Sequence, residues 1–235
     1  MHYLVMKKIS KRLSNQIEQI EKTKLYEPLE ALTLLKKITN TKFNETIEAH
    51  ISLNIDPKYN DQQLRASLIL PQGTGKSIRL AVVTSENDLE IARKAGADVY
   101  GSDDLINQIL QEEINFDVLI ATPEQMPKLA KLGKILGPKG LMPSPKSGTV
   151  TKNIPETLNE FKKGKLEYRA DKTGIVHIPF GKVDFSVQNL YENLQALFQS
   201  IERNKPTGVR GRYFNSFYIC TTMSPSVQIG LNYFK

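Results

Sequence analysis

The sequence predicts an α/β protein of two domains, in which a parallel α/β domain is inserted into a discontinuous domain of antiparallel sheet and helices. Apolar and polar residues alternate, as in half-buried strands, toward both ends of the 235-residue chain. Between these ends, short apolar runs alternate with helical segments, which is typical of a doubly wound sheet. We therefore assign residues 1–71 and 164–235 to the discontinuous domain and residues 72–163 to the insert, with Gly73 and Gly164 as paired hinges.

Two helices and a long strand are predicted in the first segment. Isoleucine and leucine recur at helical spacing in residues 7–24, which begin with a basic cluster. A second helix begins at Pro28, a favourable first-turn residue, and its apolar stripe runs to Ile38. Every second residue is apolar from Thr46 to Ile55, which predicts a strand with one buried face.

The inserted segment contains three apolar runs short enough to be strands covered on both faces. Strands are predicted at residues 78–83, 98–100 and 116–121, and helices at residues 85–95, 103–110, from 122 onward and 155–163. In the third helix, Thr122 is placed as the N-cap, Pro123 occupies the first position, and Gln125 is placed for a capping box.

The last segment returns to alternation. Residues 166–170 and 175–179 are predicted to form a hairpin around a turn at residues 171–174. A helix with one apolar stripe starts near Ser186, residues 213–222 form a strand, and one more strand is expected after Pro225. We expect the hairpin and the strand at 213–222 to complete the sheet begun by residues 46–55.

Composition and charge point to a polyanionic partner. The net charge is +7 and the pI is about 9.3, while 40% of the residues are hydrophobic, which is enough for two cores. A membrane surface is the second candidate partner, but no apolar run approaches the ~20 residues of a spanning helix. The single cysteine, Cys220, lies in an apolar and aromatic stretch, so we expect a buried thiol in a reducing compartment.

A basic loop from Lys131 to Thr151 combines glycine and proline, so neither a long helix nor a regular strand is expected. No acidic residue interrupts its lysines between Glu124 and Glu156. Glycine amides add unblocked donors for anions. The loop is either a solvated basic segment or a phosphate-binding one, and its length favours polymeric nucleic acid over a nucleotide. The lysines that carry this hypothesis are Lys131, Lys134, Lys139 and Lys146.

Catalytic and metal chemistry find no support. The segment from Gly73 to Ser77 resembles the end of a P-loop, but Leu70 stands where that motif needs glycine, and a strand follows instead of a helix. Three scattered histidines and one cysteine are too few for a zinc site, and no nucleophile-elbow motif occurs. We predict no enzyme activity, no cofactor and no metal site. His50 and His177 fall on the polar faces of predicted strands, which favours a surface or RNA-contact role.

Three further groups combine cations, rings and hydroxyls. Lys42, Phe43 and Thr46 open the long strand, Arg169 stands beside the turn that contains Lys172 and Thr173, and residues 213–226 mix aromatic with hydroxyl residues. Each group is common in core strands and turns. Converged on one face, they would recognise folded RNA through its shape, its 2′-hydroxyls and its phosphates.

These segments resemble the L1 family of large-subunit ribosomal proteins, whose members form the mobile stalk beside the tRNA exit site. The matching blocks follow the family order and are residues 42–46, 55–58, 132–146, 148–150, 171–174, 221–223 and 225–226. One departure is Ser224, where the family pattern usually has glycine. Residues 55–64 look most like cyanobacterial and plastid members, which implies a chloroplast ribosome, with the bacterial cytoplasm as the alternative.

The resemblance implies a Rossmann-like insert and binding to large-subunit (23S-type) ribosomal RNA, chiefly through the discontinuous domain. The implied RNA contacts are Lys42, Phe43, Thr46, Arg169, Lys172, Thr173, Ser216, Thr222 and Met223. The loop lysines are expected to contact RNA or exit-site tRNA secondarily, and the protein to assist release of deacylated tRNA. A translational repressor that binds an mRNA copy of the ribosomal site is the alternative function, because the same domain would serve both.

Overall fold

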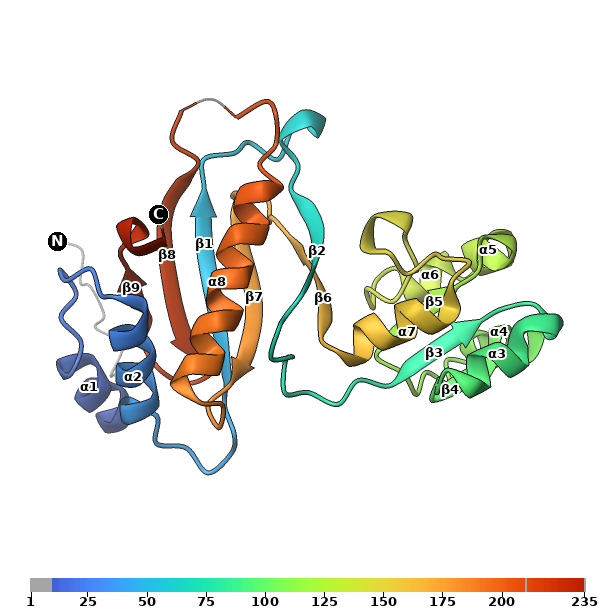
Figure 1. Cartoon of the computed structure of the whole chain (residues 1–235), viewed down its shortest axis with the longest axis horizontal. Helices are drawn as coiled ribbons and strands as arrows, with labels where there is room; N and C mark the ends of the chain where they lie inside the picture. The colour runs from blue at the N-terminus through green and yellow to red at the C-terminus, as the bar shows by residue number, and fades with distance from the viewer. Residues whose placement is uncertain (1–9, 210, 235) are drawn as a thin grey trace, which may run out of the picture. The chain divides into compact units, whose positions relative to one another are not determined.

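The computed structural model describes residues 10–209 and 211–234 (Figure 1). The chain divides into two compact units: unit 1 comprises Met1–Leu64 with Arg169–Lys235, and unit 2 comprises Arg65–Tyr168. Unit 1 contains an antiparallel sheet and unit 2 a parallel one, so the predicted fold class is confirmed. The predicted domain limits at 71/72 and 163/164 remain a prediction. They differ from the limits of the units only around the ribbon of β2 (Arg65–Ile69) and β6 (Lys165–Arg169).

The sheet of unit 1 has four antiparallel strands in the order β7-β1-β8-β9. The strands are β1 (Thr46–Leu53), β7 (Ile175–Lys182), β8 (Phe214–Thr221) and β9 (Val227–Ile229). Helix α2 (Pro28–Ile38) and helix α8 (Val187–Arg203) pack against one face of this sheet (Figure 1). Short 3₁₀ turns η1 (Asn60–Gln62) and η5 (Leu231–Phe234) complete the unit.

Alternation in the sequence explains how this sheet and helix meet. The apolar residues of β1 are all buried and are Ile47, Ala49, Ile51 and Leu53. They are buried on the side of the sheet that α8 covers. On that side Phe198 of α8 stacks on Phe217 of β8. The helix begins where expected, because the Ser186 hydroxyl accepts the Asn189 N–H at 3.1 Å.

The first predicted helix is shorter than residues 7–24. Helix α1 spans Lys11–Glu18, and residues 7–9 lie outside the described part of the chain. Beyond it the amides find other partners: Ile20 N–H bonds the Ile17 carbonyl, and Glu21 N–H donates to the Tyr26 hydroxyl at 2.9 Å. These bonds replace the helical i→i−4 ladder, so the apolar periodicity overestimated the length of the helix.

The predicted hairpin of residues 166–170 with 175–179 is wrong. Strand β6 pairs with β2, which the alternation did not reveal, and only a single bridge joins Ala170 to Val176. Strand β7 pairs with β1 along its length, while the backbone groups of β6 are used in its separate ribbon with β2. The sheet begun by β1 is therefore completed by β7, β8 and β9, without β6.

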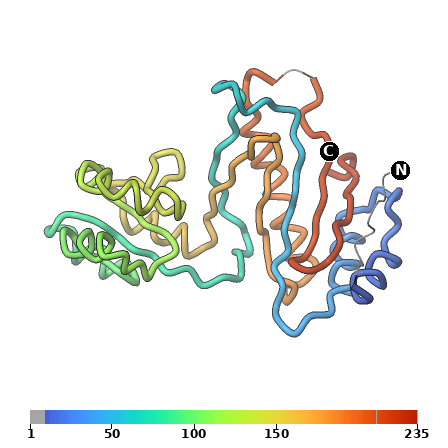
Figure 2. Tube along the Cα trace, turned by 180° about the vertical axis from the view of Figure 1, so that it is seen from behind, coloured from blue at the N-terminus to red at the C-terminus, as the bar shows by residue number. Residues whose placement is uncertain are grey.

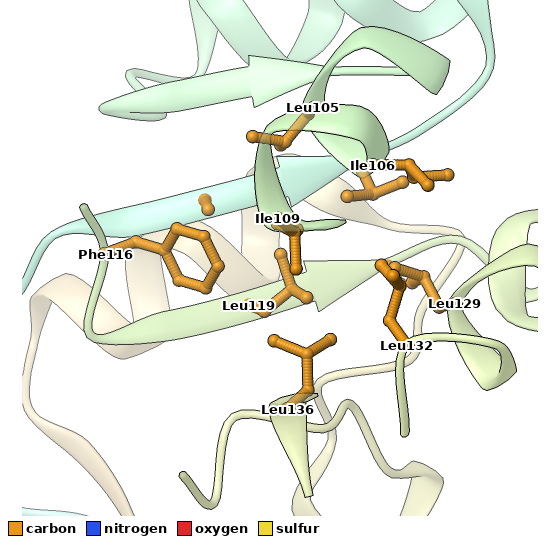
Figure 3. Packing of buried hydrophobic residues seen from close by; sticks show 11 residues of the cluster. Leu105, Ile106, Ile109, Phe116, Leu119, Leu129, Leu132 and Leu136 are labelled. Carbon is orange, nitrogen blue, oxygen red and sulfur yellow. The ribbon is translucent and has the colours of Figure 1, made fainter. Parts of the chain in front are cut away.

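Unit 2 has a parallel sheet in the order β4-β3-β5. Its elements are β3 (Leu80–Val83), η2 (Glu86–Asp88), α3 (Leu89–Lys94), β4 (Val99–Gly101), α4 (Asp103–Leu110), β5 (Val118–Ala121), η3 (Pro123–Gln125), α5 (Met126–Ala130), α6 (Gly133–Leu136), η4 (Pro145–Ser147) and α7 (Ile154–Lys162). All four residues of β3 are buried. Helices α4, α5 and α6 pack on one face (Figure 3) and α3 and α7 on the other, as in a doubly wound sheet.

The capping box predicted after Thr122 does not form. Thr122 has extended backbone angles, but its side chain makes no cap hydrogen bond. The Gln125 N–H donates instead to the Thr122 carbonyl at 3.1 Å, which closes a 3₁₀ turn, and α5 begins only at Met126. The Thr122 carbonyl thus accepts the N–H group that the Thr122 hydroxyl would accept in a capping box.

The basic loop contains no long helix and no regular strand, as predicted. Leu132 and Leu136 anchor it in the core of unit 2. Its far end is fixed by the Thr149 hydroxyl, which accepts the Ser144 N–H at 2.8 Å, and by a bridge from Val150 to Ala121 beside β5. The loop is therefore an ordered part of unit 2.

Gly73 and Gly164 lie against each other within unit 2. Both have positive φ, +69° and +102°, and a Cβ on Gly164 would lie 2.7 Å from the Gly73 Cα. Leu70 N–H donates to the Gly164 carbonyl at 3.3 Å. The position requires glycine at residue 164, whereas the role of the pair as hinges remains a prediction.

Candidate nucleic-acid interface

One face of the unit 1 sheet carries no helix of that unit among the described residues, and we call it the open face. Figure 2 shows it from behind α8, with β1, β7 and β8 toward the viewer. Strand register places side chains of equal parity on this face. At one end Thr46 pairs with Lys182, and at the other Ser52 pairs with Ile175 and Ser216. About 20 Å separates these ends at ~3.3 Å per residue.

Five predicted RNA contacts gather where β1 begins. The Thr222 N–H donates to the Thr46 carbonyl at 3.1 Å, and the Thr46 N–H donates to the Thr222 hydroxyl at 3.2 Å. Lys182 Nζ donates to the Thr46 hydroxyl at 2.7 Å. Lys42 and Phe43 precede the strand and are exposed, the ring at 54%. A cation, an aromatic ring and two hydroxyls thus meet at one end of the open face.

Met223, the fifth of these residues, is held by a buried carboxylate. Glu45 Oε2 accepts the Met223 N–H at 2.9 Å, while the Met223 side chain is 46% exposed. Burial alone would raise the pKa of Glu45, but the neighbouring Thr221 hydroxyl and the hydrogen-bonded Met223 amide outweigh it and lower that pKa. The charged carboxylate therefore fixes the loop that presents Met223.

Ser224 fits the turn where the family pattern usually has glycine. Its hydroxyl accepts the Thr221 N–H at 2.9 Å, and its own N–H donates to the Thr221 carbonyl at 3.2 Å. Among the described non-glycine residues, only Glu112 has a positive φ. A serine at position 224 thus needs no glycine-like backbone and adds a bond that closes the turn.

The other predicted contacts lie at the far end of the open face. Asp171 Oδ1 accepts the N–H groups of Thr173 and Ile175, each at 2.8 Å, and this hydrogen bonding lowers the pKa of Asp171. The Leu53 N–H donates to the Gly174 carbonyl at 3.0 Å, which ties the turn to the end of β1. Predicted contacts in this second group are Arg169, Lys172, Thr173 and Ser216. The structure therefore separates the nine residues into two groups on unit 1.

Residues between the two groups include both strand histidines. His50 and His177 lie on the open face, as predicted, and the strand register makes them partners across β1 and β7. Cys220 is half-buried, not buried as predicted, because residues 216, 218 and 220 of β8 point to the open face. Burial and the nearby carboxylates of Glu48 and Glu45 raise the pKa of Cys220 to about 11, so it is a neutral thiol.

Sequence reasoning missed Lys182 and Glu45. A β-bulge between Ile47 and Glu48 shifts the register with β7, and this shift moves Lys182 to the open face beside Thr46. Glu45 looks like a surface glutamate in the sequence, and no pattern there signals that the Met223 loop covers it. Both positions depend on pairing between segments more than 130 residues apart.

The lysine loop of unit 2 presents its cations to solvent. The four predicted lysines, 131, 134, 139 and 146, are exposed and have no ion-pair partner within the described chain. By contrast, Lys128 pairs with Asp103 and Lys165 with Glu160. The segment at Gly73–Ser77 precedes β3, and its Lys76 pairs with Asp117 at 2.9 Å, so it offers no helix N-terminus to a nucleotide.

Other chemistries find no site in the part of the chain that the structure covers. No group of three or more His, Cys, Asp or Glu side chains there could hold a metal ion. No helix there is long and apolar enough to cross a membrane. The fold and the open face define a class of basic, two-unit proteins that present polar sheet surface and cationic loops.

The family of the chain follows from its matches. A model described as the Ribosomal protein L1p/L10e family matches residues 35–225, and the chain belongs to this family. Its members are structural components of ribosomes and not enzymes.

Relatives are similar over nearly the whole chain. Large ribosomal subunit protein uL1c of Trieres chinensis is 58% identical over 232 residues, 97% of this chain and 100% of the relative. The uL1c protein of Rhodomonas salina is 57% identical over 230 residues, 98% of each chain. Large ribosomal subunit protein uL1 of Prochlorococcus marinus is 56% identical over 227 residues, 97% of this chain and 96% of the relative. The predicted plastid or cyanobacterial type is thereby confirmed.

Proposed function

We propose that this chain is a structural constituent of the large ribosomal subunit that binds large-subunit ribosomal RNA through the open face of unit 1. The observation that carries the proposal is the gathering of Lys42, Phe43, Thr46, Thr222 and Met223 at one end of that face. Folded RNA offers phosphates to the lysine, base faces to the ring and 2′-hydroxyls to the threonines.

The second group, at the Asp171 turn, extends this interface. Its Asx-type turn is rigid, because one carboxylate oxygen accepts two backbone amides. Lys172 and Arg169 are exposed beside it and supply cations for a second stretch of phosphate backbone. Two anchored groups about 20 Å apart suit a folded RNA better than a single phosphate or nucleotide.

In the ribosome, the complex forms the mobile stalk at the tRNA exit site and assists release of deacylated tRNA. The exposed loop lysines of unit 2 are the secondary contact with RNA or exit-site tRNA. Similarity to uL1c proteins supports a chloroplast ribosome, and similarity to cyanobacterial uL1 keeps a bacterial one compatible.

Affinity for a fragment of the stalk ribosomal RNA is expected to fall steeply with salt. Binding through ~4–6 phosphate contacts displaces condensed counterions, and at ~0.7–0.9 per contact gives a log–log slope of about −3 to −5. Filter binding between about 50 and 300 mM KCl measures it. If binding persists with a slope near zero, phosphate contacts are not the main source of the affinity, and the proposal is overturned.

Substitutions at the first group are expected to weaken binding more than substitutions in the lysine loop. Thr222→Val and Met223→Ala each remove a contact from a closely packed, dehydrated interface, which costs ~1–3 kcal/mol. Lys139→Ala and Lys146→Ala remove exposed charges and cost less than ~1 kcal/mol each.

Filter binding with the same RNA fragment compares these variants, and circular dichroism checks their folding. Thr33→Val is the matched control, because this exposed threonine belongs to α2, on the helix-covered side of the sheet. Equal losses at both groups, or a greater loss in the loop, would move the primary site to unit 2.

A further inference from the structure

A pair of histidines lies between the two groups of the open face, beside the turn that carries the second group. His50 in β1 and His177 in β7 are direct partners, and their Nδ1 atoms are 2.8 Å apart. On its other side, His50 Nε2 lies 3.1 Å from the Cys220 Sγ in β8. Three neighbouring strands thus contribute one chain of polar contacts.

Two carboxylates flank this chain. Glu48, on β1, has its Oε2 4.0 Å from His50 Nε2, and Asp171, in the turn before β7, has its Oδ2 3.8 Å from His177 Nε2. On β8 the neighbours are Cys220, which stays a neutral thiol, and Tyr218, the cross-strand partner of His50. Both carboxylate distances exceed that of a hydrogen bond, so they favour a positive charge on the pair without occupying its donors.

Geometry allows the pair one extra proton at a time. A hydrogen bond between two Nδ1 atoms needs one donor and one acceptor, and two imidazolium rings would instead set like charges and two N–H groups face to face. Burial and the neighbouring His177 lower the pKa of His50. We therefore take His50 as the acceptor of the pair, and His177, whose side chain is 51% exposed, presents its Nε2 to solvent.

We propose that His177, oriented by His50, is a proton-dependent contact to the phosphate backbone of the RNA on the open face. The proposal rests on the proposed function and adds a residue to it. Protonated His177 donates its Nδ1–H to His50 and keeps its Nε2–H for a phosphate oxygen, as a charge-assisted hydrogen bond. His50 is a positioning residue, since it fixes the tautomer and the ring of its partner.

The sign of the pH effect follows from linkage. Bound phosphate stabilises the protonated pair, so the extra affinity is fully present at acidic pH and is lost as the pH rises through the protonation range of the complex. Between about pH 8 and pH 5.5 we expect affinity to rise about three- to tenfold, as for one charge-assisted contact. The salt slope should steepen by ~0.7–0.9, as for one more phosphate contact.

The test measures binding of the full chain to the stalk RNA fragment at both pH values. His177→Gln should lose the gain at acidic pH, because glutamine does not titrate. His50→Leu should move the midpoint of the affinity–pH profile to lower pH, since the imidazolium loses its acceptor. Thr33→Val, on the helix-covered side of the sheet, is the control and should keep the wild-type profile.

Each outcome separates the two proposals. A wild-type affinity that does not change with pH, or a His177→Gln variant that keeps the wild-type gain, overturns the role of His177 while leaving RNA binding intact. Absence of binding at pH 8 overturns the proposed function instead. If circular dichroism shows a variant misfolded, NMR titration of the wild-type His177 ring with and without RNA decides, since a purely structural ring would titrate identically in both.

Discussion

A chain in which residues 72–163 are replaced by a short Gly/Ser linker is expected to fold and to bind the stalk RNA within roughly tenfold of the full chain, a loss of ~1.4 kcal/mol. The open face is built from β1, β7 and β8, and the helices behind it also belong to unit 1. The ends to be joined are adjacent, because Leu70 N–H bonds the Gly164 carbonyl at 3.3 Å. Filter binding and urea unfolding of the shortened chain measure both expectations.

The reciprocal fragment, residues 72–163, should fold but bind the same RNA about a thousandfold more weakly or worse, as for non-specific contacts. Its two cores pack on its own parallel sheet, so it needs no support from unit 1. Affinity of the shortened chain for tRNA should fall more than its affinity for stalk RNA, because the lysine loop leaves with the fragment. A fragment that holds most of the stalk RNA affinity would contradict the assignment of the open face.

Gly164→Ala is expected to destabilise unit 2 by about 3 kcal/mol. A φ of +102° is strained for any residue with a Cβ, and the added atom would meet the Gly73 Cα at 2.7 Å. Backbone on both sides of the contact leaves no flexible side chain to move aside. Urea unfolding, followed by a probe within unit 2, measures the loss of free energy.

Gly140→Ala is the matched control within the same unit. Gly140 has a φ of +70°, but nothing lies within 4 Å of its Cβ position, so only the left-handed backbone costs energy, ~1 kcal/mol. The difference between the two variants isolates the contact between the glycines. Equal losses would mean that Gly73 moves away without cost and that the pair is not closely packed in solution.

The sequence pattern correctly predicted elements that bury either one face or all of their residues. Strand β1 alternates along its length, β3 is buried throughout, and α8 has an unbroken apolar stripe. Ribbon β2–β6 was missed as a pair because β2 is mostly half-exposed and lacks alternation. The capping box failed because side-chain and main-chain acceptors compete for the same N–H, which the sequence alone does not resolve.

For the open face, residue types were predictable and their grouping was not. Parity along β1 and β8 places Thr46, Ser216 and Thr222 on one side, as the predicted alternation already required. Their division into two groups depends on the register of strands far apart in sequence. Lys182 joins the first group only through a bulge, and His50 meets His177 only because β7 pairs in that register.

The route of the chain between the units has a consequence for the history of the protein. It leaves unit 1 after Leu64 and returns at Arg169, and the Ala170 N–H donates to the Leu64 carbonyl at 3.0 Å. The two crossings between the units are therefore hydrogen-bonded neighbours. None of the strands in the order β7-β1-β8-β9 comes from residues 65–168. A single insertion of coding sequence between the codons of residues 64 and 169 is enough to add the whole of unit 2 to an ancestor that already had the complete sheet of unit 1.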